Sequence, residues 1–303
     1  MSALAGLQHT KAAQTGKLTL PDGRQLAWRQ VGAAQGVPVF HCHGGLSCAA
    51  EIDFADAQCR ALGVRWLAAD RPGIGDSDPQ PARRLSDWAA DLRALLAHLG
   101  IARIAVTGWS AGGPYALACA AALPEVWAVA TLAGMAPLRG RADIAALGMA
   151  TDRLLFSLSP RSPKLAAVAL APSAHVPEAL LRQAIKRMLT DSVDGASLDT
   201  ETSRAVARCY RHSLRQGSRW TVQDYRLLAS DWGFSLPDIR VPVDVWHGEQ
   251  DTLLVAEHGQ RLAAGLTNAT LHRLDGYGHF LPQRHLGAVL RTLCHRFQDS
   301  APT

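Results

Sequence analysis

The sequence predicts an α/β protein in which a mostly parallel sheet is flanked by helices. Two observations support this fold class. Short apolar, often β-branched runs alternate with longer helical stretches from Lys17 onward, as in chains of parallel strands joined by helices. The 303 residues are 48% hydrophobic and 19% charged, which is enough apolar material to bury a sizeable core.

The first half of the chain is expected to supply most of the sheet. A turn is predicted between two short apolar segments at Pro21-Asp22-Gly23, because these residue types strongly favour turns. The two segments and the turn therefore predict an opening hairpin. The hairpin strands and the buried strands after them are expected at residues 18–20, 26–30, 37–41, 64–69, 104–107 and 126–132.

Two helices are expected between these strands. Residues 86–99 place apolar side chains on one helical face, and Ser86 is the expected N-cap. Residues 111–123 form a stretch rich in small side chains that stops at Pro124, because proline cannot continue a helix.

The strand rhythm then stops. Residues 139–237 contain helical stretches, such as 176–189 and 203–214, but no convincing buried strand. We therefore expect a core domain made of residues 1–138 and 238–303, with residues 139–237 inserted as a helical cap. The later strands and the last helix of the core are expected at 243–246, 270–274 and 286–297.

The charge of the chain is modest and uneven. The net charge is +5, which is too diffuse over this length to predict a nucleic-acid partner. Residues 1–138 carry +1, residues 139–237 carry +5, and residues 238–303 carry −1. The excess on the cap is explained either by a solvated helical surface or by a lid that attracts anionic ligands.

The cysteines and the apolar stretches bear on the compartment. Six cysteines occur without a Cys-x-x-Cys pair, which is typical of a reducing compartment, so no disulfide or zinc site is expected. The first seventeen residues have no basic start before an apolar run, so no signal peptide is expected. Residues 109–138 are apolar but are broken by glycine and proline, so no membrane span is expected. These observations predict a cytoplasmic protein.

Ser110 is the candidate nucleophile. The segment Gly108-Trp109-Ser110-Ala111-Gly112 follows a predicted strand and opens a predicted helix. A nucleophile elbow needs this context, because its sharp turn exposes the serine and requires glycine two positions before and after it, where side chains would clash. In this type of site the backbone N–H of the next residue, here Ala111, holds the oxyanion.

A serine nucleophile needs a base and an acid that orients the base, in the chain order Ser, Asp or Glu, His. Asp251 is the candidate acid because it follows the strand at residues 243–246, and Glu249 is its nearest rival. His279 is the candidate base because it follows the strand at residues 270–274 and is flanked by glycine. His41, Cys42 and His43 are not expected to bind metal, since strand alternation turns Cys42 away from His41 and His43 and no cluster of further ligands is visible.

The chain resembles serine hydrolases of the α/β-hydrolase fold superfamily that carry a helical cap. The resemblance covers residues 18–297 and rests on five segments in order: HGG at 43–45, DRPGIGDSD at 70–78, GWSAGG at 108–113, HGEQD at 247–251 and GYGHF at 276–280. It implies that the N–H of Gly45 is the second oxyanion donor. It also implies a structural turn at residues 70–77, with no catalytic role for Asp70.

Departures from the family's patterns narrow the chemistry. Dehalogenase-like and epoxide-hydrolase-like members carry aspartate at the elbow, where this chain has Ser110, so Tyr210 and Tyr225 in the cap do not indicate an epoxide hydrolase. Peptidase-like members usually have proline where this chain has Leu46, so a peptidase is not indicated either. Many carbon-carbon bond hydrolases have tryptophan where Phe280 stands, which makes that class the alternative rather than the leading hypothesis.

The leading hypothesis is a serine hydrolase that cleaves a small carboxylic ester or a related acyl compound through an acyl-enzyme. One alternative is a carbon-carbon bond hydrolase that acts on a diketone-like substrate with the same triad. Another is a small-molecule receptor that keeps the pocket without turnover. No cofactor or metal is implied, the expected partner is a small-molecule substrate, and the sequence leaves the oligomeric state open.

Overall fold

The structure, a computed structural model, describes residues 13–299, which form an eight-stranded sheet in the order β1-β2-β4-β3-β5-β6-β7-β8. The strands span Gln14–Thr19 (β1), Gln25–Gly32 (β2), Val37–Cys42 (β3), Val64–Ala69 (β4), Ile104–Trp109 (β5), Val126–Leu132 (β6), Val243–Gly248 (β7) and Ala269–Leu274 (β8). The pairs β1–β2 and β2–β4 are antiparallel and the others are parallel. The predicted fold class and the opening hairpin are confirmed.

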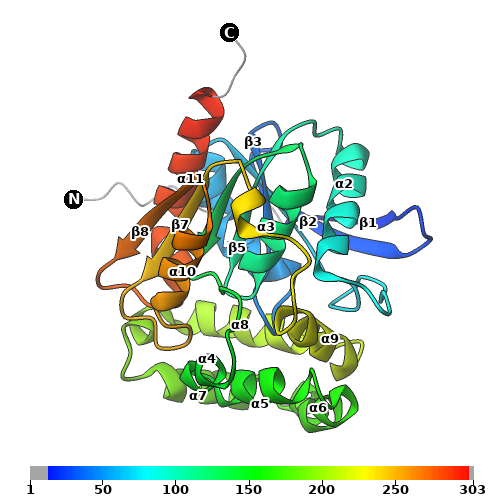
Figure 1. Ribbon diagram of the computed structural model, residues 1–303, viewed down its shortest axis with the longest axis vertical. Helices are drawn as coiled ribbons and strands as arrows, with labels where there is room; N and C mark the ends of the chain where they lie inside the picture. The colour runs from blue at the N-terminus through cyan, green and yellow to red at the C-terminus, as the bar shows by residue number, and fades with distance from the viewer. Residues whose placement is uncertain (1–12, 300–303) are drawn as a thin grey trace.

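Helices cover both faces of this sheet (Figure 1). Helices α2, α3 and α10 contribute to one apolar cluster, and α1 and α11 contribute to another. The helices and 3-10 turns of this part of the chain span Ala49–Ala55 (η1), Asp56–Ala61 (α1), Leu85–Asp87 (η2), Trp88–Leu99 (α2), Gly112–Ala122 (α3), Leu236–Asp238 (η5), Glu257–Gly265 (α10) and Leu281–Asp299 (α11).

Between β6 and β7 the described chain forms helices and no strand. Figure 1 shows these helices gathered on one side of the sheet. We call residues 139–237 the cap, although the domain boundaries at 138 and 238 stay a prediction. Its elements span Arg141–Ala146 (α4), Ala150–Leu158 (α5), Pro163–Leu170 (α6), Ala171–His175 (η3), Glu178–Leu189 (α7), Val193–Ser197 (η4), Thr200–Ser213 (α8) and Ser218–Leu228 (α9).

The parallel register brings the carboxyl ends of β5, β6 and β7 to one edge of the sheet. Trp109 at the end of β5 pairs with Leu132 of β6, which pairs with Trp246 of β7. All residues of these three strands are buried, as parallel strands covered on both faces should be. The loops that follow the strands therefore meet at one edge.

The predicted N-cap of α2 is wrong. The helix begins at Trp88 after the η2 turn, so Ser86 lies inside that turn. The Asp87 carboxylate instead accepts a hydrogen bond from Arg84 N at 2.8 Å, which satisfies a backbone donor at this end. Six helices have no counterpart among the predicted elements, because short segments give weak periodicity: α1, α4, α5, α6, α9 and α10.

The residues 13–299 include no helix with the length and apolar character needed to cross a bilayer. The expectation of no signal peptide concerns mainly residues 1–12, which lie outside the described residues.

Candidate active site

Ser110 lies on the sharp turn that joins β5 to α3, where the sequence predicts an elbow. Its φ of 54° falls in the left-handed region that residues other than glycine seldom adopt. Ser110 N donates a hydrogen bond to Leu132 O at 2.9 Å. The Ser110 carbonyl accepts from Gly113 N at 3.0 Å and from Met135 N at 3.1 Å. The surrounding backbone therefore holds the serine in its strained conformation.

The two glycines that stand two positions before and after Ser110 are required by close packing. A Cβ on Gly108 would lie 2.4 Å from Gly112 O, and a Cβ on Gly112 would lie 2.0 Å from Cys42 O. Any larger residue would force these backbone segments apart. The glycines of the motif thus let the elbow pack against β3.

Asp251 and His279 are in direct contact, although 28 residues separate them. His279 Nδ1 donates to Asp251 Oδ2 at 2.8 Å. The other carboxylate oxygen of Asp251 accepts from Leu253 N at 2.9 Å and from Leu254 N at 2.8 Å. With both oxygens engaged, the carboxylate fixes one ring nitrogen of His279 as a donor and leaves Nε2 as the free nitrogen.

The electrostatics of this pair favour a charged carboxylate beside an imidazole that accepts protons readily. Burial alone would raise the pKa of Asp251, but the His279 charge and hydrogen bonds from His247 and His279 lower it below its ordinary value. Burial alone would lower the pKa of His279, but the charge and hydrogen bond of Asp251 raise it above 6.5.

Glu249, the rival for the acid, points elsewhere. Its carboxylate pairs with Arg273, at 2.6 Å between Glu249 Oε1 and Arg273 Nε. No hydrogen bond between Glu249 and His279 is found within the described chain. Of the two carboxylates, Asp251 is therefore the one that is hydrogen-bonded to His279.

Gly45 and Ala111, the predicted oxyanion residues, lie side by side. A Cβ on Gly45 would be 3.4 Å from the Ala111 Cβ. Neither backbone N–H has an acceptor among residues 13–299, and both residues line the same cavity as Ser110 and His279. Two free donors at one place make a site for a developing negative charge.

The two histidines of β3 and its following loop are engaged in hydrogen bonds to protein groups. His41 contacts Thr107 Oγ1 at 2.9 Å and Glu51 Oε1 at 2.7 Å. His43 Nδ1 donates to Gly44 O at 3.0 Å, and its Nε2 accepts from Arg71 N at 3.3 Å. Burial and the neighbouring Arg71 charge hold the pKa of His43 well below its ordinary value, so the ring is neutral.

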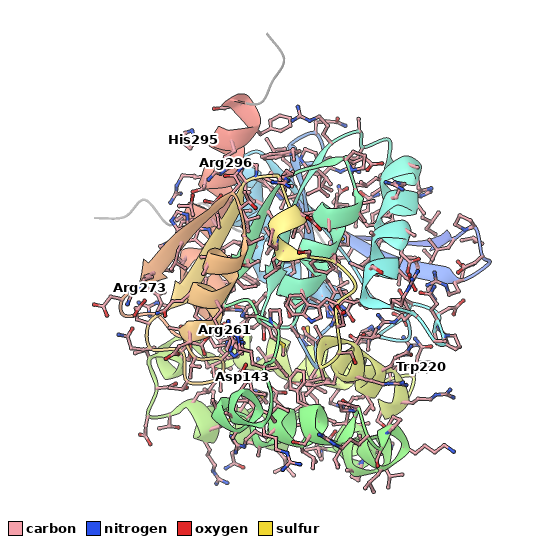
Figure 2. The ribbon with its side chains drawn as sticks, viewed as in Figure 1. Asp143, Trp220, Arg261, Arg273, His295 and Arg296 are labelled. Atoms are coloured by element: carbon pink, nitrogen blue, oxygen red, sulfur yellow. The ribbon has the colours of Figure 1, made fainter. Side chains whose placement is uncertain are left out.

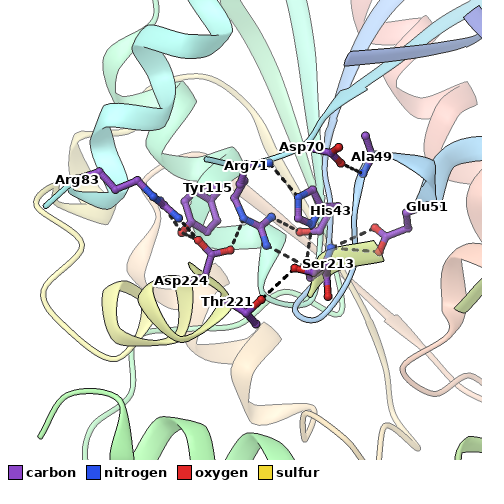
Figure 3. A network of polar contacts seen from close by, with 11 residues as sticks. His43, Ala49, Glu51, Asp70, Arg71, Arg83, Tyr115, Ser213, Thr221 and Asp224 are labelled. Carbon is purple, nitrogen blue, oxygen red and sulfur yellow. Dashed lines mark hydrogen bonds and ion pairs between the residues drawn. The ribbon is translucent and has the colours of Figure 1, made fainter. Parts of the chain in front are cut away.

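A buried ion network that the sequence analysis missed supports the loop of Gly45 (Figure 3). Arg71 Nη1 donates to His43 O at 2.5 Å and Nη2 donates to Gly44 O at 2.9 Å. Its Nε donates to Asp224 Oδ2 of the cap at 2.7 Å. Because Arg71 holds two successive carbonyls, it fixes the peptide group that carries the Gly45 N–H and the peptide group before it.

The segment containing Asp70 has the structural role that the resemblance implies. Asp70 Oδ1 accepts from Ala49 N at 2.7 Å, and Oδ2 accepts from Asp76 N at 3.0 Å. A Cβ on Gly75, where φ is +53°, would lie 2.2 Å from the Asp70 carboxylate. The turn therefore closes around this side chain.

A cavity of about 1420 Å³ lies between the cap and the edge of the sheet. Its lining includes Asp152 and Tyr225 of the cap, and Tyr225 OH donates to Asp152 Oδ1 at 2.6 Å. No sequence signal pointed to Asp152, which lies in a helix that periodicity did not predict. Three arginines of the cap, Arg208, Arg211 and Arg215, also line the cavity.

Comparison with known proteins agrees with this geometry. The model of the alpha/beta hydrolase fold family matches residues 37–282. A 2-hydroxy-6-oxononadienedioate/2-hydroxy-6-oxononatrienedioate hydrolase of Cupriavidus pinatubonensis is 29% identical over 233 residues, which cover 76% of this chain and 75% of the relative. A pimeloyl-(acyl-carrier protein) methyl ester esterase of Aromatoleum aromaticum is 30% identical over 226 residues, covering 72% of this chain and 81% of the relative.

Solved structures agree on the fold. An esterase from Exiguobacterium antarcticum superposes with a TM-score of 0.67 at 19% identity, over 94% of this chain and 100% of the esterase. The matched region contains every strand from β3 to β8 and each of the five segments noted in the sequence. The chain therefore belongs to the alpha/beta hydrolase fold family.

Proposed function

We propose that this hydrolase is a serine hydrolase that cleaves a small-molecule carboxylic ester or a related acyl compound. Ser110 attacks the carbonyl carbon while His279 takes the serine proton, and Asp251 holds the imidazole and stabilises its charged form. His279 then gives the proton to the leaving alcohol. Water, activated by the same histidine, hydrolyses the acyl-enzyme.

The observation that carries this proposal is the hydrogen bond of 2.8 Å between His279 Nδ1 and Asp251 Oδ2, made beside a cavity that Ser110 also lines. It leaves the second ring nitrogen of His279 available to accept the serine proton. The free N–H groups of Gly45 and Ala111 support the same reaction, because they can bind the oxyanion of the tetrahedral intermediate.

The experiment is covalent labelling with a fluorophosphonate probe, which reacts with activated serines. The wild-type protein should be labelled and should hydrolyse at least one member of a panel of acyl esters of graded chain length and charge. Ser110→Ala should abolish both labelling and hydrolysis while retaining the wild-type circular dichroism spectrum. Labelling that persists in the variant would disprove the assignment of Ser110.

Carbon-carbon bond hydrolysis is the second candidate, with the same triad acting on a diketone-like substrate. The observation in its favour is that several relatives are hydrolases named for 2-hydroxy-6-oxo substrates, among them the Cupriavidus hydrolase and a 2-hydroxy-6-oxo-6-phenylhexa-2,4-dienoate hydrolase of Comamonas testosteroni. Comparing kcat/KM for an ester and for a diketone of similar size decides between the two. A folded protein that neither reacts with the probe nor turns over any substrate would favour a receptor.

We also propose that residues 139–237 form a cap domain and that the protein works in the cytoplasm. The cap proposal is supported by the run of helices between β6 and β7. The reducing compartment is supported by the six cysteines, all of them free thiols.

A further inference from the structure

The carboxylate of Asp194 lies against the backbone of His279. Asp194 belongs to η4 in the cap and is 1% exposed. Its Oδ2 accepts from His279 N at 2.8 Å, and its Oδ1 accepts from Phe280 N at 2.8 Å. One cap side chain therefore holds both the peptide of the candidate base and the peptide that follows it.

These two N–H groups immediately precede α11, which begins at Leu281. Backbone donors at the start of a helix have no partner within the helix, and a carboxylate is favourable there because of the helix dipole. Hydrogen bonds to a charged group are stronger than neutral ones. Asp194 therefore fixes the backbone at the point where the loop enters the helix.

The fit at this contact is close. A Cβ on Gly278 would lie 2.3 Å from Asp194 Oδ2 and 2.6 Å from its Cγ. On the other side of the loop, Trp109 Nε1 donates to His279 O at 2.9 Å. The backbone of His279 is thus held by Asp194 of the cap at its N–H and by Trp109 at its carbonyl.

A second carboxylate of the cap is linked to the loop that contains Gly45. Asp224 of α9 binds Arg71, which in turn binds the carbonyls of His43 and Gly44. Both loops that flank the candidate nucleophile are therefore tied to buried cap carboxylates.

We propose that Asp194 is a positioning residue that holds the base His279 in its reactive orientation, so that the cap is a fixed part of the catalytic apparatus rather than a lid that opens at each turnover. This inference rests on the proposed function, in which His279 transfers the proton. A movement of the cap that withdrew Asp194 would release the His279 peptide and disturb its geometry to Ser110.

The negative charge of Asp194 should affect the pKa of His279, which an effect of packing alone would not do. The carboxylates that face His279 are Asp251 from the loop after β7, Asp194 from η4 and Asp152 from α5, and all three raise its pKa, against the lowering effect of burial. Removing the Asp194 charge should therefore lower the pKa of His279. Since the base must be neutral, the acid limb of the pH profile should then move to lower pH.

The first test compares Asp194→Asn with Asp143→Asn. Asp143 is also a cap carboxylate that contacts the core, since it accepts from Arg261 Nη1 at 2.6 Å (Figure 2), but it touches neither catalytic loop. Asp194→Asn should lower kcat about 10- to 100-fold, as a displacement near 1 Å does, with KM changed less than about threefold. The acid limb of the pH profile of Asp194→Asn should move to lower pH. Asp143→Asn should have the wild-type kcat and the wild-type acid limb.

The second test approaches the contact from the core side and remains available if Asp194→Asn does not fold. Gly278→Ala should push on the Asp194 carboxylate and lower kcat to a similar extent. Because Asp194→Ala removes the carboxylate that the new Cβ would strike, the double variant should be no worse than Asp194→Ala alone. Gly278→Ala combined with Asp143→Ala should show no such coupling.

Several outcomes would overturn the inference. A kcat within twofold of wild type in Asp194→Asn or Gly278→Ala would do so, as would an equal loss in Asp143→Asn, which would indicate a general effect of cap docking. The inference would also be contradicted if the losses of kcat in Gly278→Ala and Asp194→Ala multiplied in full in the variant that combines them. If Ser110→Ala is inactive while these variants are fully active, only this inference fails, whereas activity in Ser110→Ala would refute the proposed function itself.

Discussion

Asp224→Ala should destabilise the protein far more than the loss of an ion pair at the surface. Asp224 is the anion between Arg71, whose Nε donates at 2.7 Å, and Arg83, and it also accepts from Tyr115 OH at 3.1 Å. The side chains are almost completely buried, at 1% exposure for each arginine and 4% for the aspartate. Guanidinium groups stay charged in proteins, so the variant would leave two buried cations without their anion.

The expected loss follows from the cost of such an unpaired charge. Removing one partner of a buried ion pair costs about 3–5 kcal/mol. For a chain of this size, about 1 kcal/mol lowers Tm by roughly 2 °C, so Tm should fall by about 6–10 °C. Asp224→Asn should lose less, because its amide oxygen still accepts from an arginine. Because Arg71 also holds the carbonyls of His43 and Gly44, kcat should fall as well.

The assay is thermal unfolding followed by circular dichroism, with Arg84→Gln as the control. Arg84 pairs with Asp87 at the surface and is 80% exposed, so this control should move Tm by less than about 2 °C. A Tm shift in Asp224→Ala no larger than that of Arg84→Gln would refute the reasoning, because it would mean that the two arginines are stable without this anion.

Three further predictions concern the acid of the candidate triad, the pH dependence of the base and the basic residues of the cavity. Asp251→Asn should lower kcat by about 10⁴, since the wrong tautomer of the base had that effect in a serine protease, whereas Glu249→Gln should change kcat less than about threefold; the reverse ranking would reassign the acid. The acid limb of kcat/KM should have its midpoint above pH 6.5, because the pKa of His279 is raised and the base works only when neutral; a profile with a lower midpoint would contradict this. If Arg208 and Arg211 attract anionic substrates to the cavity they line, kcat/KM for a carboxylate-bearing ester should fall with added NaCl while that for a neutral ester stays flat; parallel salt curves would assign them to solvated surface.

The placement of the candidate triad, Ser110, Asp251 and His279, was predictable because the signals for these residues are local. Each candidate residue follows a short apolar strand within a few positions, and the rule that parallel strands end at one edge brings the loops together. Ser110 also has the glycines that its turn requires, which can be recognised without any knowledge of the rest of the chain. The sequence ranked Asp251 above Glu249 in the same loop, and the structure adds that Asp251 is hydrogen-bonded to His279 whereas Glu249 pairs with Arg273.

The supports of the triad were not predictable because they depend on pairing at long range. Arg71 and Asp224 are 153 residues apart in the sequence. Each is a charged residue of a type that usually lies at the surface, so neither can be recognised as buried until its partner is known. Asp194 lies in a short polar segment before α8, which by sequence resembles an exposed turn. Only the packing of the cap on the sheet places these carboxylates beside the catalytic loops.

This packing also changes the meaning of the charge excess in the cap. The count of +5 for residues 139–237 includes Asp194 and Asp224, which are buried against the core and contribute little to the outer surface. Asp224 is moreover compensated by arginines of the core rather than of the cap. The cap surface that meets solvent is therefore more positive than the sequence count indicates, which strengthens the salt-dependence prediction for an anionic ester.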